Sequence, residues 1–167
     1  LREFVPAGKP CTTVWPAADA RYFFPRPPAD AFHRLLDERQ GAFVLFYHGN
    51  VHAANAREMR ELYAAVARLN AEGEPVTLIR AGVDQVAFLE PALVARVAPH
   101  VLSLGQILNH RHLPPLMALA DAFVQPGEPD AFNDYRFPSK LPEFFALGRP
   151  VILPRTNLGE HVRHGED

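Results

Sequence analysis

The sequence predicts an α/β fold in which a parallel sheet is covered by helices on both faces. Five short apolar runs recur along the chain, at residues 42–49, 75–82, 100–105, 122–126 and 149–154. Each run is apolar throughout instead of alternating, which is typical of a strand buried on both faces. Helical patterns separate these runs, and that order favours a Rossmann-like sheet joined by right-handed crossovers.

The helices are indicated by their own periodicity. From Asn55 to Glu72, apolar residues recur every three or four positions, and Gly73 ends this helix. Pro91 must lie near a break or in a first turn, because proline lacks the backbone N–H of a helix interior. Further helices are expected at residues 29–40, 84–97, 113–119, 141–147 and 157–163.

Composition limits the classes of protein to which this chain can belong. Its 167 residues are enough for about one domain, and the apolar share of 48% is ordinary for a globular protein. The net charge of −2 predicts no nucleic-acid partner. A single cysteine, Cys11, excludes an internal disulfide framework and suits a reducing, cytoplasmic location. No apolar run reaches the about 18 residues of a membrane span.

Two parts of the chain differ in character. Residues 1–28 are rich in proline and aromatic side chains, and we expect an extended linker or N-terminal segment that lies against the domain. Residues 29–167 are expected to form the domain itself. The chain opens without methionine, so we expect a fragment. It stops after the start of a helix, without the further strand and helix that such a domain normally carries, so we expect the domain to be truncated at its C-terminus.

The stretch from Ala120 to Pro154 is the most informative one. It reads as buried strand, polar loop, short helix and second buried strand. Ligands of open α/β sheets bind at the carboxyl ends of the strands, so this loop predicts a nucleotide or sugar-nucleotide site. Its candidate site residues are Asp130, Asn133, Arg136, Ser139, Lys140 and Glu143.

Elementary chemistry assigns roles to some of these residues. The first N–H groups of a helix starting near Pro138 are unpaired and favour an anion such as a diphosphate. Lys140 and Arg136 add positive charge, and the Glu143 carboxylate suits two adjacent hydroxyls, as on a ribose. Arg80 is expected at the same sheet edge. Gly49 follows the first strand, where a glycine lets a ligand approach the backbone.

Plainer interpretations remain open for the same residues. Glu143 can simply complement a helix dipole, and Asp130 can be a loop or cap residue. Lys140 and Arg136 can be solvated, and Ser139 suits a cap better than a nucleophile, since no His–Asp partners accompany it. The chain's histidines lack the spacing of a ligand set, so we expect neither a metal nor a cofactor.

Several segments, in order, resemble the C-terminal, donor-binding half of glycosyltransferases with the GT-B fold, especially glycosyltransferase family 4. EFFALGRPV (143–151) is similar to the family's Glu-x-x-x-x-Gly-x-Pro-Val, and PGEPDAFN (126–133) to the loop before it. LPPLMALADAFVQP (113–126) is similar to its helix, Ala-Asp, strand and proline. VLSLGQI (101–107), FYHGN (46–50) and RTNLGEHVRHGED (155–167) extend the resemblance to about residues 42–167.

The resemblance implies roles for two acids. The family's second acid, which binds the ribose hydroxyls, corresponds to Glu143. The first, which contacts the donor sugar, is placed at Asp130 as the catalytic candidate, with Glu128 and Asp134 as open alternatives. The spacing between the two acids is longer here, which indicates an insertion around residues 133–140.

The family's two phosphate-binding cations are less well matched. Asn50 stands at the arginine position after Gly49, and Arg57 is the basic residue nearest the lysine position. By resemblance, the full-length protein is a retaining transferase of carbohydrate biosynthesis that needs no metal. Its donor would be a nucleoside-diphosphate sugar. A missing N-terminal domain would hold a sugar, lipid or protein acceptor, and the full-length enzyme could associate peripherally with a membrane. We expect the fragment alone to be inactive.

Two other functions stay open at this point. One is another GT-B enzyme, such as a nucleotide-sugar epimerase. The other is a non-enzymatic, flavodoxin-like ligand-binding or signalling domain. The latter predicts a phosphorylatable aspartate in an acidic pocket at the end of the first strand, where this chain has His48, Gly49 and Asn50.

Overall fold

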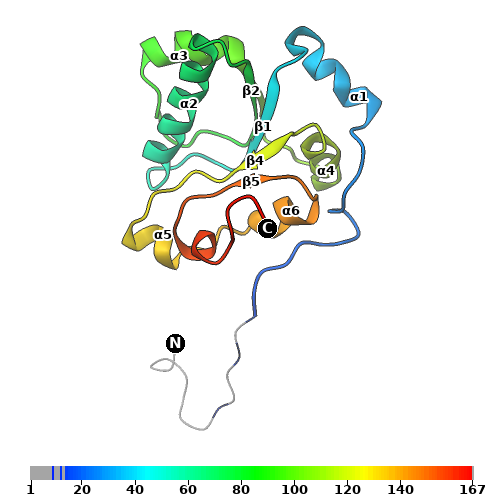
Figure 1. Cartoon of the computed structure of the whole chain (residues 1–167), viewed down its shortest axis with the longest axis vertical. Helices are drawn as coiled ribbons and strands as arrows, with labels where there is room; N and C mark the ends of the chain where they lie inside the picture. Colours follow the sequence, from blue (N-terminus) through cyan, green and yellow to red (C-terminus); the bar gives the residue numbers. More distant parts are fainter. Residues whose placement is uncertain (1–8, 10–11, 13, 167) are drawn as a thin grey trace.

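The computed structural model describes residues 9, 12 and 14–166, and it confirms the predicted fold class (Figure 1). Five parallel strands form one sheet in the order β3-β2-β1-β4-β5. The chain moves outward from β1 in one direction and then returns to add β4 on its other side. The carboxyl ends of β1 and β4 therefore flank a topological switch point, where a crevice forms. The strands are β1 (Phe43–His48), β2 (Val76–Ala81), β3 (Val101–Gly105), β4 (Ala122–Val124) and β5 (Val151–Ile152).

Helices lie where the periodicity placed them, with shorter bounds at several positions. The α-helices are α1 (Asp30–His33), α2 (Ala56–Ala71), α3 (Pro91–Val97), α4 (Leu113–Met117), α5 (Ala131–Tyr135) and α6 (Leu141–Ala146). Short 3₁₀ turns are η2 (Arg34–Arg39), η3 (Ala98–His100), η4 (His110–His112) and η5 (Asn157–Glu160).

Two helical predictions differ from the structure for local reasons. The helix predicted from residue 84 begins only at Pro91, whose fixed φ and missing N–H suit a first turn. The helix predicted from Asn157 is a 3₁₀ turn. One helix was not foreseen, since α5 forms within the loop after β4.

Side chains of β1 alternate between two hydrophobic cores. Val44 and Phe46 pack with residues of α4 and α6, while Leu45 and Tyr47 pack with residues of α2 and α3. Both faces of the sheet are therefore buried, which explains the uninterrupted apolar runs. The same alternation directs His48, the last residue of β1, toward the α6 face.

The described part of the N-terminal segment packs against the domain. Phe23 is buried in the α4–α6 core, and its ring centroid lies 5.3 Å from that of His110. Trp15 contacts Phe137 edge-on at 5.4 Å. Figure 1 shows the segment leaving α1 and passing the side of the domain that carries α4 and α6. Cys11 lies outside the described residues.

Candidate functional site

β1 and β4 are joined tightly near their amino ends. A carboxylate oxygen of Asp121 accepts a hydrogen bond from the Val44 N–H at 2.8 Å, and the Asp121 N–H donates to the Val44 carbonyl at 2.9 Å. The Ala-Asp pair before β4 therefore aligns the two strands. Their carboxyl ends then diverge into the loops after His48 and Val124.

Two glycines bring backbone segments together at this edge. Gly49 has φ +140°, and a Cβ on it would lie 2.6 Å from the Lys140 Nζ. A Cβ on Gly82 would lie 2.2 Å from the Gly49 carbonyl oxygen. A side chain on Gly82 would collide with the backbone of Gly49, and one on Gly49 would take the space that the end of the Lys140 side chain occupies.

Lys140 is a strongly perturbed titratable group of this edge. Its Nζ lies 3.1 Å from the Tyr47 hydroxyl and 4.2 Å from the centroid of the Tyr47 ring. Burial, with a smaller contribution from the positive charge of Arg136, lowers the pKa of Lys140 to about 7. An anion in contact with this ammonium group would restore its charged form.

Glu143 lies on the other face of the same strand end. Its Oε2 is 3.0 Å from the Nε2 of His48, and both side chains are less than one-fifth exposed, at 19% and 17%. The His48 ring also meets the Phe144 ring edge-on at 5.3 Å. The end of β1 is thus held from one face by Lys140 and from the other by Glu143.

An open cavity of about 340 Å³ adjoins Lys140, and this volume lies within the range of small-ligand sites. Arg136, Lys140 and His52 supply the basic groups of its wall, and no acid lines it. The cavity is therefore suited to an anion. Its lining residues are Tyr47, Asn50, His52, Asn55, Arg136, Phe137, Pro138, Ser139 and Lys140.

The positive charge of the site comes from side chains more than from a helix end. The sequence suggested free N–H groups at a helix starting near Pro138, but α6 spans only Leu141–Ala146. Pro142 lies in its first turn and has no N–H to offer. Ser139 is exposed and precedes Lys140, the N-cap residue, and no side-chain cap bond forms there.

The loop after β4, which contains α5, forms the other half of the crevice; we call it the loop half. Its polar residues are organised differently. The Oδ1 of Asp130 accepts hydrogen bonds from the backbone N–H of Asn133 at 2.7 Å and from its Nδ2 at 3.2 Å, so Asp130 caps α5. The Asn133 amide also donates to the Oε1 of Glu58 at 2.7 Å. Burial raises the pKa of Glu58, although this hydrogen bond and the charge of Arg136 oppose the shift.

Glu58 was missed by reasoning from the sequence. It lies on α2 and is buried next to Met59, on the side of the helix that faces the sheet. The signal was present, because Glu58 precedes Leu62 by four positions and so shares the apolar stripe. A carboxylate on that stripe requires a buried partner, and α5 supplies Asn133.

The two alternatives for the first acid also have partners within the domain. A carboxylate oxygen of Glu128 lies 3.2 Å from a guanidinium nitrogen of Arg57. The Thr156 hydroxyl donates to Oδ1 of Asp134, and the Asn157 amide donates to the Asp134 carbonyl at 2.9 Å. The loops that follow β4 and β5 are therefore bound to each other.

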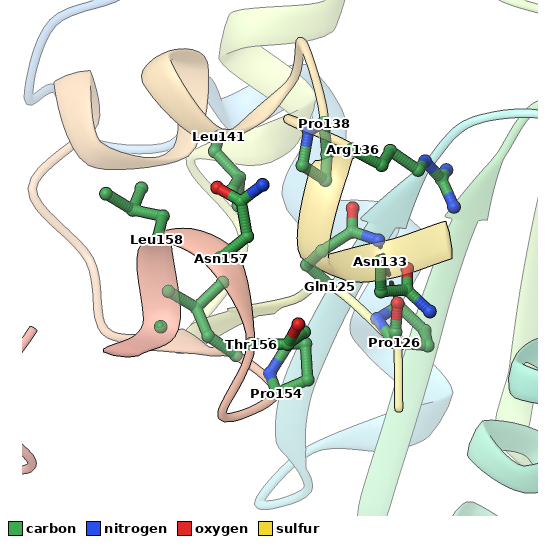
Figure 2. A pocket seen from close by; sticks show the side chains of 12 residues that line it. Gln125, Pro126, Asn133, Arg136, Pro138, Leu141, Pro154, Thr156, Asn157 and Leu158 are labelled. Atoms are coloured by element: carbon green, nitrogen blue, oxygen red, sulfur yellow. Dashed lines mark hydrogen bonds between the residues drawn. The ribbon is translucent and has the colours of Figure 1, made fainter. Parts of the chain in front are cut away.

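These two loops enclose a second, much smaller cavity, which Figure 2 shows between Gln125, Pro138, Leu141 and Asn157. Its volume of about 20 Å³ is enough for roughly one water molecule. In Figure 2 the Arg136 guanidinium points away from the small cavity. Arg136 also lines the larger cavity beside Lys140.

The remaining predicted cations do not join the site. Arg80 lies within β2, is only 3% exposed, and places Nη2 2.5 Å from Oδ1 of Asp84. Arg57 is exposed and paired with Glu61 and Glu128. Asn50, at the position of the family's arginine, accepts a hydrogen bond from the Val83 N–H at 3.0 Å. Lys140 and Arg136 are thus the two predicted cations that meet at the cavity.

Within the part of the chain that the structure describes, no three His, Cys, Asp or Glu side chains gather as a metal site would require. Among those residues there is also no helix with the length and apolar character needed to cross a membrane.

Comparisons with known proteins show the family and support the fold. The family described as "Glycosyl transferases group 1" matches residues 42–167. The fold is similar to the C-terminal domain of LpcC, a glycosyl transferase group 1 family protein from Francisella tularensis. For that pair the TM-score is 0.51 and the identity 16%, over 81% of this chain and 69% of the other.

A second similar structure is AviGT4, a glycosyltransferase involved in avilamycin A biosynthesis. Its TM-score is 0.52 and its identity 20%, over 90% of this chain. The aligned part makes up only 43% of AviGT4. At such identities, both likenesses establish the fold alone. Among curated proteins, none matches the chain.

Proposed function

Because the chain belongs to the glycosyl transferases of group 1, we propose that it binds the nucleoside-diphosphate-sugar donor of a sugar transfer. The observation that carries this proposal is the meeting of Lys140 and Arg136 at one cavity beside the end of β1. Glu143 lies at the same strand end, where it can accept hydrogen bonds from hydroxyl groups. Cations and a carboxylate acceptor at neighbouring places match a diphosphate joined to a ribose.

In the proposed complex the diphosphate occupies the cavity of about 340 Å³ and the ribose lies at Glu143. Sugar transfer leaves negative charge on the departing nucleoside diphosphate. Lys140 and Arg136 already face the place where this charge develops, so they stabilise the transition state without reorganisation. The donor contacts proposed for Ser139 and Gly49 follow from their positions beside Lys140.

The donor sugar is assigned to Asp130. Within the described residues, hydrogen-bond donors reach its Oδ1 and leave its Oδ2 for a sugar hydroxyl. Asn133 orients Asp130 through the same cap. Retention of the anomeric configuration belongs to this proposal, as does an acceptor held by a domain outside these residues. The fragment alone would then bind nucleotide weakly and transfer no sugar.

Titration calorimetry of the 167-residue chain with UDP, GDP and ADP tests the donor site. We expect saturable binding of at least one of them. Glu143→Gln keeps the shape of the side chain but removes the charged acceptor, which should weaken binding by about 10- to 100-fold. Glu74→Gln, at an exposed position, is the matched control and should change nothing. Absence of saturable binding to all three nucleotides would refute the proposal.

A further inference from the structure

His48 is a polar side chain at the end of a strand that is otherwise apolar. The alternation along β1 directs it toward α6, and there its Nε2 lies 3.0 Å from the Oε2 of Glu143. No ligand-binding role for His48 was predicted from the sequence. Its position beside the carboxylate proposed to bind the ribose indicates one.

The ring of His48 is held in place by the hydrophobic core. It packs edge-on against Phe144, with an interplanar angle of 89°, and Phe144 is itself stacked on Phe123 with centroids 4.6 Å apart. Both phenylalanines are fully buried. These contacts restrict the orientation of the imidazole, which lies beside the carboxylate of Glu143.

The protonation state of the pair follows from its surroundings. Burial lowers the pKa of His48, while Glu143 opposes that shift and Lys140 and His110 add to it. A neutral imidazole carries one N–H, and the two buried atoms, Nε2 of His48 and Oε2 of Glu143, lie 3.0 Å apart without the alignment of a full hydrogen bond. A proton on Nε2 would face this carboxylate oxygen. Oε2 of Glu143 is the buried oxygen of the carboxylate and faces His48, which leaves Oε1 for a ligand.

We propose that His48 is the positioning residue that presents Oε1 of Glu143 to the ribose hydroxyls. On this view the pair selects ribonucleotides over nucleotides that lack the 2′ and 3′ hydroxyls. The inference rests on the donor site proposed above and extends it, because it explains how a carboxylate on a short helix is held at one angle. A side chain that binds a ligand is commonly held in its orientation by a neighbouring side chain that does not touch the ligand.

The experiment compares three ligands by calorimetry: the best-binding nucleoside diphosphate, its 2′,3′-dideoxy analogue and inorganic pyrophosphate. The wild type should prefer the ribonucleotide by about tenfold or more, since a charged acceptor and a hydroxyl form a strong hydrogen bond. His48→Phe keeps the aromatic contact with Phe144 but has no N–H. It should reduce this preference to within about twofold, while pyrophosphate binding changes by less than about twofold.

Two further variants separate positioning from packing. His48→Gln retains an N–H donor and should keep most of the preference. His33→Phe changes an exposed histidine of α1 and should leave all three affinities unchanged. Circular dichroism checks that each variant is folded.

The outcomes divide cleanly between the two proposals. If His48→Phe weakens all three ligands equally, or if both His48 variants keep the wild-type preference, the role of His48 is refuted and the donor site stands. If the wild type binds pyrophosphate but no nucleoside diphosphate, the donor site fails, and the inference fails with it.

Discussion

The crevice has two halves, the loop after β4 and the start of α6. Both carry charged side chains, but these side chains have different partners. In the loop half, Asp130, Asn133 and Glu58 satisfy one another through hydrogen bonds of 2.7 to 3.2 Å. In the helix half, Lys140 and Glu143 contact the last residues of β1, and Lys140 also borders an open cavity. Polar residues in both halves have partners, and what distinguishes the helix half is the open cavity beside Lys140.

The cause of the difference is the extra helix α5. It occupies the loop after β4, uses Asp130 as its cap and turns Asn133 inward to Glu58. The loop half is therefore stabilised by its own polar groups. Variants in the two halves should separate stability from ligand affinity, and the following four tests are ordered by expected size.

Removing the amide of Asn133 should give the largest effect on stability. Asn133→Leu leaves the buried Glu58 carboxyl without its donor, which should lower the free energy of unfolding by about 1–3 kcal/mol in urea denaturation. Nucleotide affinity should change little. The double variant Glu58→Leu/Asn133→Leu removes both partners and should recover much of the loss. A tenfold drop in affinity for Asn133→Leu would show that the loop half binds the nucleotide directly.

Replacing Lys140 should move stability and affinity in opposite directions. The buried ammonium, whose pKa is lowered to about 7, is costly without an anion. Lys140→Met should therefore raise the free energy of unfolding by about 1–2 kcal/mol and weaken nucleotide binding by about tenfold. Lys9→Met, at an exposed position, serves as the control. If Lys140→Met binds the nucleotide as tightly as the wild type does, then Lys140 does not contact the nucleotide.

Asp130 can be tested for two roles at once. Asp130→Ala removes the cap of α5 and should cost about 1 kcal/mol of stability. Asp130→Ser keeps a capping oxygen but no carboxylate, so stability should be largely retained. Binding of a nucleoside-diphosphate sugar, compared with the free nucleoside diphosphate, then reports sugar contact. If the affinity for the nucleotide sugar relative to that for the free nucleoside diphosphate is the same in the wild type and in Asp130→Ser, then Asp130 caps α5 and does not contact the sugar.

The smallest expected effect is a pH dependence at His48. Because burial lowers the pKa of His48 below its ordinary value of 6.5, its contribution to stability is present above pH 6.5 and is lost as pH falls through the lowered pKa. Between pH 7 and 5.5 the loss should stay below about 1 kcal/mol. Thermal melts of the wild type should show this slope, and His48→Gln should reduce it. Adding Lys140→Met to both the wild type and His48→Gln removes the contribution of the neighbouring lysine to this slope.

Much of this molecule was predictable from local sequence patterns. The five apolar runs are the five strands of the sheet, and Lys140 and Arg136 were assigned to the correct edge. The role of Glu58 and the partner of Glu143 were not predicted. Lys140 and Tyr47 are 93 positions apart in the sequence, and Asn133 and Glu58 are 75 apart. Periodicity reports only neighbours a few residues away, so it carries no information about such pairs.

The sequence by itself determined the elements of the fold, because burial on both faces of a strand and on one face of a helix leaves a period that can be read directly. It also determined which charged residues follow β4. Which of these residues gather at the cavity beside β1 depends on the tertiary structure. That choice depends on strand order and on how the chain crosses the end of β1: Lys140 and Glu143 meet Tyr47 and His48 there, while Asp130 and Asn133 are used by α5.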